Sequence, residues 1–209
     1  MGFFPDQQDL PEGKGDGEPR QPVWANPPDD VLAGVVPVEL VLGRSESTVV
    51  LLSGVRAFPV GLGMRLGVRV RGRIGRRNLH EQVFDGPYTD ATDAAWQAGR
   101  LKWGFELADG RRVTNVDVNP FLEQRNQDHH RSEGADDERP WEPDHPVLSG
   151  GGGGGSPRSI DRDYWLWPLP PAGRLRVVCQ WPARGIELSV HDLDAEPFLE
   201  AAGRAELVW

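Results

Sequence analysis

The chain has 209 residues, which predicts one domain with appendages, and only 38% of the residues are hydrophobic. The formal net charge of −9 argues against general binding to nucleic acid, and a single cysteine excludes an internal disulfide and a cysteine-based zinc cluster. No basic leader and no run of ~20 apolar residues is present, so we expect a cytoplasmic protein without membrane contact.

The first 30 residues are polar and rich in proline, glycine and aspartate. Such a segment cannot bury enough apolar surface to order itself, so we expect a disordered N-terminal arm over 1–30. Trp24 is the large apolar residue that could dock this arm locally.

Strand signals begin after the arm, with short β-branched runs at 35–42 and 47–55. The clearest predicted strand is 63–73, where apolar and basic residues alternate. Side chains alternate between the two faces of a strand, so one face should be apolar and the other basic. The apolar set is Met64, Leu66, Val68 and Val70, and the other set is Arg65, Gly67, Arg69 and Arg71.

The segment 101–107 also alternates, and Asp109-Gly110 after it predicts a hairpin with a return strand over 111–118. Between 63–73 and this hairpin, a short helix is expected near 90–98, ending at Gly99. The segment 123–158 then becomes acidic and glycine-rich, which predicts a flexible insert whose glycine run at 150–155 acts as a tether. Ser156-Pro157-Arg158 follows the glycines, so the run is not a phosphate-binding loop.

After the insert, strands are expected at about 162–168, 174–181 and 185–191, followed by a short helix capped by Asp194. The final residues could add a strand or pack Trp209 on the core. In 174–181, Cys179 shares a face with three apolar residues, which favours a buried thiol over a nucleophile.

These elements predict an all-β protein, an immunoglobulin-like β-sandwich of about seven or eight strands with one or two short helices, including one near the C-terminus. We expect a single domain over 31–209, interrupted by the flexible insert at about 123–158. Strands before and after the insert should complete the two sheets together, because the ~50 residues after it make a marginal unit alone.

The C-terminal part has a distinctive pattern, WPLPPxGxLxxxCxWPxxGI, over 167–186. With the paired alanines at 201–202 and the tryptophan near the end, it resembles an uncharacterised actinobacterial family in which a similar segment often follows a glycine-rich stretch. The resemblance implies a shared β-rich fold over about 150–209. It implies no activity and carries no functional residues.

Catalytic and metal signals are weak in this sequence. His129 and His130 lie in the acidic insert, and no histidine pair has the helical spacing of a zinc motif. The carboxylates lie mainly in the predicted flexible segments, and no nucleophile motif is present. We therefore expect no metal, no cofactor and no enzymatic activity.

The basic face of 63–73 is the strongest candidate for a binding site. The candidate partner-binding residues are Arg65, Arg69, Arg71, Arg73, Arg76 and Arg77. We interpret this face as a surface that docks an acidic partner, most simply another protein, because guanidinium groups suit carboxylates. Two other interpretations stay open: the chain's own acidic insert covers the face, or the face is ordinary solvated surface in an arginine-rich protein.

A second hypothesis is a β-sandwich that binds carbohydrate or another small ligand through exposed aromatic rings. The candidate ligand-binding residues are Trp103, Trp165, Trp167 and Trp181. Their alternation with polar residues is more typical of core positions than of a binding platform. An uncharacterised enzyme is the third hypothesis.

Overall fold

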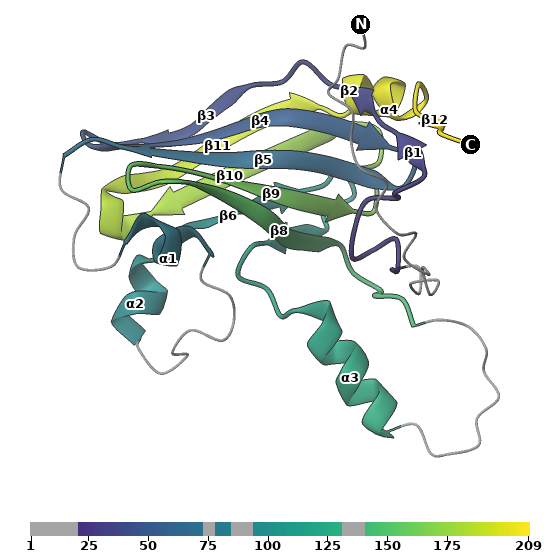
Figure 1. Cartoon of the computed structure of the whole chain (residues 1–209), viewed down its shortest axis with the longest axis horizontal. Coiled ribbons are helices and arrows are strands. Elements are labelled where there is room, and N and C mark those ends of the chain that lie inside the picture. The colour runs from purple at the N-terminus through teal and green to yellow at the C-terminus, as the bar shows by residue number, and fades with distance from the viewer. Residues whose placement is uncertain (1–20, 73–77, 85–93, 131–140) are drawn as a thin grey trace, which may run out of the picture.

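The computed structural model describes residues 21–72, 78–84, 94–130 and 141–209, which fold into a β-sandwich (Figure 1). These residues form twelve strands in three sheets, with few short helices, which confirms the predicted all-β sandwich. There are more strands than the seven or eight expected, partly because β1 (Val31–Leu32), β2 (Gly34–Val35) and β12 (Glu206–Leu207) are very short pairings.

The larger sheet has six strands, and β5 lies in its middle. Its order is β2, β4 (Thr48–Phe58), β5 (Gly61–Val70), β9 (Ser159–Trp167) and β8 (Val147–Ser156), with β3 (Leu40–Arg44) also paired to β4. The apolar residues of β5 are buried and its arginines are exposed, which confirms the predicted two-faced strand. We call the face that carries Arg65 and Arg69 the outer face, and the face toward the core the inner face.

The smaller sheet has four strands, in the order β11 (Ile186–Asp194), β10 (Arg174–Trp181), β6 (Lys102–Glu106) and β7 (Arg112–Thr114). β6 and β7 form the predicted hairpin, and Gly110 in its turn has a φ of 85°, which favours glycine. Trp103 and Tyr164 join the two sheets through an edge-to-face contact, with ring centroids 4.7 Å apart.

Both sheets combine strands from the two halves of the sequence, as predicted. β5 pairs with β9 in the larger sheet, and β6 pairs with β10 in the smaller one. The buried inner-face side chains of all four strands belong to one hydrophobic cluster, whereas Trp165 of β9 is buried on the outer face. The segment between β7 and β8 therefore interrupts the sequence without dividing the fold.

The glycine run at 150–155 is not a tether, so this prediction is wrong. It lies within β8, which pairs with β9 from Val147 opposite Trp167 to Ser156 opposite Ser159. Composition favours a coil because glycine loses much conformational entropy on ordering. The ordered partner strand β9 overrides this preference, since its inner side chains are part of the hydrophobic core.

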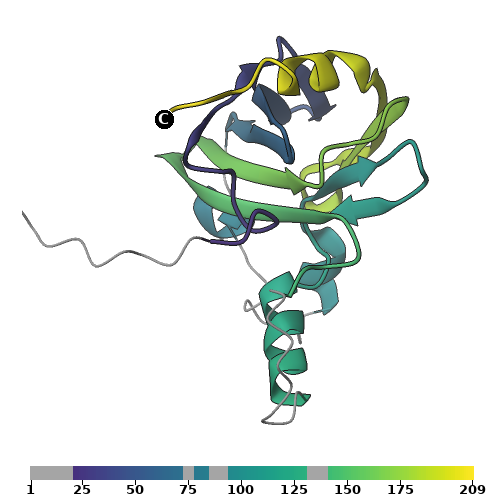
Figure 2. The same cartoon turned by 90° about the vertical axis from the view of Figure 1, so that its right-hand side faces the viewer.

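The remainder of the expected insert contains a helix and a segment outside the described residues. α3 (Pro120–His130) occupies its beginning, where a flexible chain was expected, and residues 131–140 lie outside the described residues. α3 extends away from the sandwich (Figures 1 and 2). It is attached near its start, where the ring centroids of Phe121 and Trp24 are 4.8 Å apart.

The prediction of a disordered arm is also wrong for residues 21–30, which are placed against the sheet. Residues 1–20 lie outside the described residues. Trp24 is 1% exposed, so it docks this segment as expected. The indole Nε1 of Trp165 donates to the carbonyl oxygen of Val23 at 3.0 Å, which places the segment over the outer face of β9.

The remaining helices are short: α1 (Leu79–Phe84), α2 (Ala94–Gly99), the 3-10 turn η1 (Pro182–Arg184) and α4 (Glu196–Ala202). α2 and α4 correspond to the two predicted helices, whereas α1 was not expected. β12 pairs with β1 at the chain end, and Trp209 is 93% exposed rather than packed on the core. No helix in the described segments has the length and apolar character needed to cross a membrane.

Candidate functional site

The predicted basic face is neutralised in part by the neighbouring strand. Nε of Arg65 lies 2.9 Å from Oδ1 of Asp163, and Nη2 of Arg69 lies 2.8 Å from Oδ1 of Asp161. The hydrogen bond that Arg65 donates to Asp163 raises the pKa of Arg65. The carboxylates that pair with Arg65 and Arg69 come from β9, and residues 131–140 of the acidic insert lie outside the described residues.

Arg71 is exposed at the end of β5, and the other three predicted residues, Arg73, Arg76 and Arg77, lie outside the described residues. Nε of Arg71 donates to the backbone carbonyl oxygen of Glu46 at 2.6 Å, and Arg71 makes no ion pair with a described residue. The guanidinium of Arg71 is thus oriented by the β3–β4 turn while its charge stays uncompensated there.

A further arginine, Arg44, joins this end of the outer face. Arg44 is opposite Val49, and Val49 is opposite Arg69, so the three side chains lie across the outer face at one level. Arg44 is exposed and makes no hydrogen bond or ion pair with a described residue. Arg44 could not be assigned to this face from the sequence, because it lies two strands away from Arg69.

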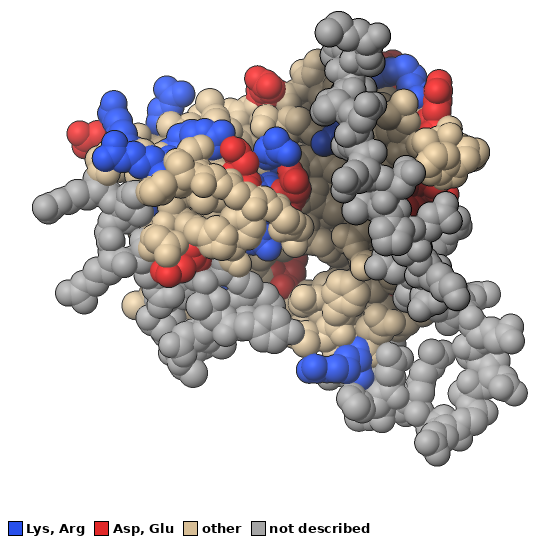
Figure 3. All heavy atoms as spheres, in the orientation of Figure 1, with Lys and Arg blue, Asp and Glu red and all other residues tan. Residues whose placement is uncertain are grey.

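These side chains surround a hollow of about 360 Å³, lined by Arg44, Glu46, Val49, Arg69 and Arg71, among others. The carbonyl oxygen of Arg158, in the β8–β9 turn, accepts a hydrogen bond from the N–H of Val70, so a fourth exposed arginine is close to this end of the sheet. Lys and Arg side chains gather at this end in Figure 3. We call Arg44, Arg69, Arg71 and Arg158 the arginine-rich end.

The tryptophans proposed as an alternative binding platform are mainly core residues. Trp103, Trp165 and Trp181 are only 1–3% exposed, and Trp167 is partly buried. A buried ring has no free face for a sugar to stack on, so the structure does not support a binding platform made of these rings. The burial of Trp103 and Trp181 agrees with the alternation of apolar and polar residues in β6 and β10.

Cys179 is a buried thiol, as the sequence predicted. It is 0% exposed, and burial raises its pKa to about 12. Nε2 of His191, the histidine nearest to Cys179 in the sequence, donates to the carbonyl oxygen of Leu42 at 2.9 Å. Cys179 therefore acts as a small apolar side chain in the core.

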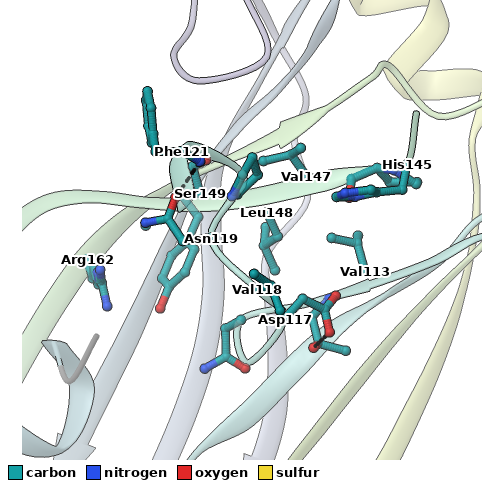
Figure 4. A pocket seen from close by; sticks show the side chains of 16 residues that line it. Val113, Asp117, Val118, Asn119, Phe121, His145, Val147, Leu148, Ser149 and Arg162 are labelled. Carbon is teal, nitrogen blue, oxygen red and sulfur yellow. Dashed lines mark hydrogen bonds between the residues drawn. The ribbon is translucent and has the colours of Figure 1, made fainter. Parts of the chain in front are cut away.

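A cavity of about 170 Å³ lies where the two sheets open next to α3 (Figure 4). Its wall combines the segment from β7 to the start of α3, the beginning of β8 and the middle of β9. In Figure 4, Arg162 and Asn119 lie on one side of the cavity, and Asp117 and His145 lie on the other. Sequence analysis did not single out this cavity, because its wall is built from three segments that are distant in the sequence.

The acidic and histidine side chains of this wall already have partners. Asp117 accepts hydrogen bonds from the N–H of Thr114 at 2.7 Å and from its hydroxyl at 2.6 Å. Nε2 of His145 lies 2.9 Å from Oε2 of Glu123 on α3, and this bond, followed by the one to the Pro146 carbonyl, raises the pKa of His145. This side of the cavity is thus a structural joint between α3 and β8.

Arg162 differs from the other charged residues near the cavity. Its guanidinium carbon lies 4.9 Å from the ring centroid of Phe84 and 5.1 Å from that of Tyr164. Nη1 donates to the carbonyl oxygen of Val83 at 3.0 Å, whereas Nε is buried without a partner. No described carboxylate pairs with Arg162.

No group of three or more His, Cys, Asp and Glu side chains with the geometry of a metal site occurs among the described residues. Comparison with protein-family models, with curated proteins and with solved structures found no significant match to this chain.

Proposed function

We propose that this chain is a non-catalytic protein-interaction module whose arginine-rich end docks an acidic partner protein. The observation that supports the proposal is the hollow between Arg44 and Arg71, two exposed arginines that have no carboxylate partner among the described residues. Arg69 lines the same hollow, although Asp161 already shares its charge. A partner that supplies carboxylates would complete the charge pairing of this end.

The chemistry of the hollow favours an acidic protein over nucleic acid. A guanidinium presents a planar fork of donors that matches a carboxylate, and Val49 between Arg44 and Arg69 gives the hollow an apolar floor. The whole chain carries a net charge of −9, which repels a phosphate polymer at long range but leaves a short contact with an acidic loop available. The immunoglobulin-like class, the cytoplasmic location and the family resemblance stay predictions.

Fluorescence polarisation with a labelled hexaglutamate peptide tests the proposal. We expect the wild type to bind the peptide and Arg44→Gln/Arg71→Gln to bind it roughly tenfold more weakly, because two charge-assisted contacts are lost. Arg56→Gln/Arg204→Gln is the matched control, since both residues are exposed and lie outside the lining of the hollow. The control should bind like the wild type.

The outcome that contradicts the proposal is equal weakening in both double variants, or no binding of the peptide by the wild type. A single-stranded oligonucleotide of matched charge serves as a second probe. Tighter binding of the oligonucleotide, lost in Arg44→Gln/Arg71→Gln, would assign this end to nucleic acid instead.

A further inference from the structure

Arg162 occupies a position of β9 that faces the core. In the β5–β9 pairing, Met64 is opposite Tyr164 and Leu66 is opposite Arg162, and Met64, Leu66 and Tyr164 are buried. Residues directly opposite each other in a sheet share a face, so Arg162 lies on the inner face, between Ile160 and Tyr164. Arg162 itself is partly buried, but its Nε is shielded from solvent without a partner, and a buried N–H without a hydrogen bond is costly.

The surroundings of Arg162 fix its plane. The rings of Phe84 and Tyr164 lie within 4.9 and 5.1 Å of the guanidinium carbon, and Nη1 already donates to Val83. Stacked rings stabilise the cation but accept no conventional hydrogen bond from its edge. The remaining terminal N–H groups of Arg162 are therefore available only in the plane of the guanidinium.

Backbone space for this arrangement comes from the glycines of β8. A Cβ atom at Gly150 would lie 2.4 Å from Nη2 of Arg162, and one at Gly153 would lie 2.9 Å from the ring atom Cζ of Phe84. A side chain at either position would push Arg162 or Phe84 away. The glycines thus allow the guanidinium to lie flat across the inner face of β8.

The cavity next to Arg162 offers further donors and an apolar wall. Tyr164 is 5% exposed and lines the cavity, and its hydroxyl makes no hydrogen bond with a described residue. Oδ1 of Asn119 accepts from the N–H of Phe121 at 2.9 Å, which leaves the Nδ2 amide without a described partner. Val113 and Val147 supply buried apolar surface in the same wall.

We propose that this cavity binds a small organic carboxylate, with Arg162 as the planar donor and the Tyr164 hydroxyl as a second donor. The ligand's carboxylate would lie in the plane of the guanidinium, and its short apolar body would extend from there into the cavity. A volume of about 170 Å³ suits a molecule of a few carbon atoms. This site is separate from the arginine-rich end and does not depend on the docking proposal.

A carboxylate fits this site better than phosphate does. A phosphate dianion needs a second cation, and the other ionisable groups of the described wall are Asp117, which is acidic, and His145, which is already bound to Glu123. A monoanionic carboxylate needs one guanidinium and one neutral donor, which are the groups present.

Titration of the 15N-labelled full chain with sodium propionate, followed by NMR, tests this inference. We expect saturable shifts of the Arg162 Nε signal and of the Tyr164 and Asn119 amides, beyond those caused by sodium chloride at equal ionic strength. Tyr164→Phe keeps the ring and should weaken propionate binding about tenfold, because one hydrogen bond to an anion is lost. Arg162→Gln should abolish binding, whereas Arg158→Gln makes the same charge change outside the cavity and should leave it unchanged.

Gly150→Ala gives an independent check, because it replaces none of the donor residues but displaces the guanidinium of Arg162. It should weaken propionate binding while the far sheet keeps its wild-type spectrum. Shifts that follow ionic strength alone, equal binding by wild type and Tyr164→Phe, or saturation by inorganic phosphate but not by propionate would each overturn the carboxylate assignment.

Discussion

Arg65 and Arg162 lie in adjacent strands of the same sheet, but on opposite faces. They differ in whether a carboxylate pairs with the guanidinium. On the outer face, Arg65 is paired at 2.9 Å with Asp163, and Arg69 at 2.8 Å with Asp161. On the inner face, the guanidinium carbon of Arg162 lies 4.9 and 5.1 Å from the centroids of two aromatic rings, and no described carboxylate pairs with it. The sequence Asp161-Arg162-Asp163 produces both environments, because alternate residues of a strand face opposite ways.

The difference separates charges that are compensated from charges that are available. Exposed ion pairs such as that of Arg65, whose side chain is 48% exposed, contribute little free energy, and they leave little net charge for a partner. Arg162 is partly buried and has no carboxylate among the described residues, so its guanidinium is available to an anion that enters the cavity.

The glycines of β8 also fall into two groups, which differ in the space around a Cβ atom. A Cβ atom at Gly153 or Gly155 would meet a backbone carbonyl oxygen at 2.2 or 1.8 Å, whereas one at Gly152 or Gly154 would meet no atom within 4 Å. One set of glycines is therefore required by close approach, and the other set is not. This pattern is specific to a paired strand, because a tether would tolerate substitution equally at every position.

The comparison predicts its largest effect for Gly155→Ala against Gly154→Ala. Both glycines have a φ that alanine can adopt, since neither is among the residues with positive φ. Gly155→Ala should lower the free energy of unfolding by about 2–3 kcal/mol, because the carbonyl of Ser159 must move, while Gly154→Ala should change it by less than about 0.5 kcal/mol. Urea denaturation measures the free energy of unfolding of both variants. Equal and small changes would contradict the paired strand and favour a flexible tether.

A smaller effect is expected from replacing one arginine on each face. Arg65→Met should destabilise the protein by up to about 1 kcal/mol, because it removes an exposed ion pair. Arg162→Met should be neutral or slightly stabilising without ligand, since methionine keeps an apolar stem and removes an uncompensated charge. Added propionate should stabilise the wild type in thermal denaturation and not Arg162→Met. A loss of several kcal/mol for Arg162→Met without ligand would make Arg162 a purely structural residue.

Local periodicity was sufficient to predict much of the fold. The alternation in β5, β6 and β10 correctly placed Met64, Trp103 and Cys179 in the core, and Asp109-Gly110 correctly predicted a hairpin. These features depend on residues a few positions apart, whose side chains the strand geometry sends to known faces.

Features that depend on pairing between distant segments could not be predicted in the same way. The partner of Arg65 depends on the register of β5 with β9, 98 residues later, and the glycine run resembles a coil until its pairing with β9 is known. The cavity requires the placement of α3 next to β8. The Asp161-Arg162-Asp163 alternation was the one local signal for it, because it places a lone arginine on the face opposite two aspartates.

The smallest expected effect concerns the joint between α3 and β8 on the opposite side of the cavity from Arg162. Bonds to Glu123 and to the Pro146 carbonyl, with a further contribution from Asp144, raise the pKa of His145 above its ordinary value of 6.5. A raised folded-state pKa means that the native state holds its proton more tightly than the unfolded chain does. The stabilisation is thus complete below 6.5 and is lost as the pH rises through the folded-state pKa. Because the His145 side chain is 41% exposed, we expect this stabilisation to be only ~0.5 kcal/mol.

Hydrogen exchange of the α3 amides, corrected for intrinsic rates, tests this expectation. In the wild type, the amides should be better protected below pH 6.5 than above the folded-state pKa of His145. Glu123→Gln should remove that pH dependence while leaving the exchange of β5 amides unchanged. If β5 lost protection in parallel with α3, the pH effect would belong to the whole sandwich, and the cavity wall would not move independently of the sheet that carries Arg162.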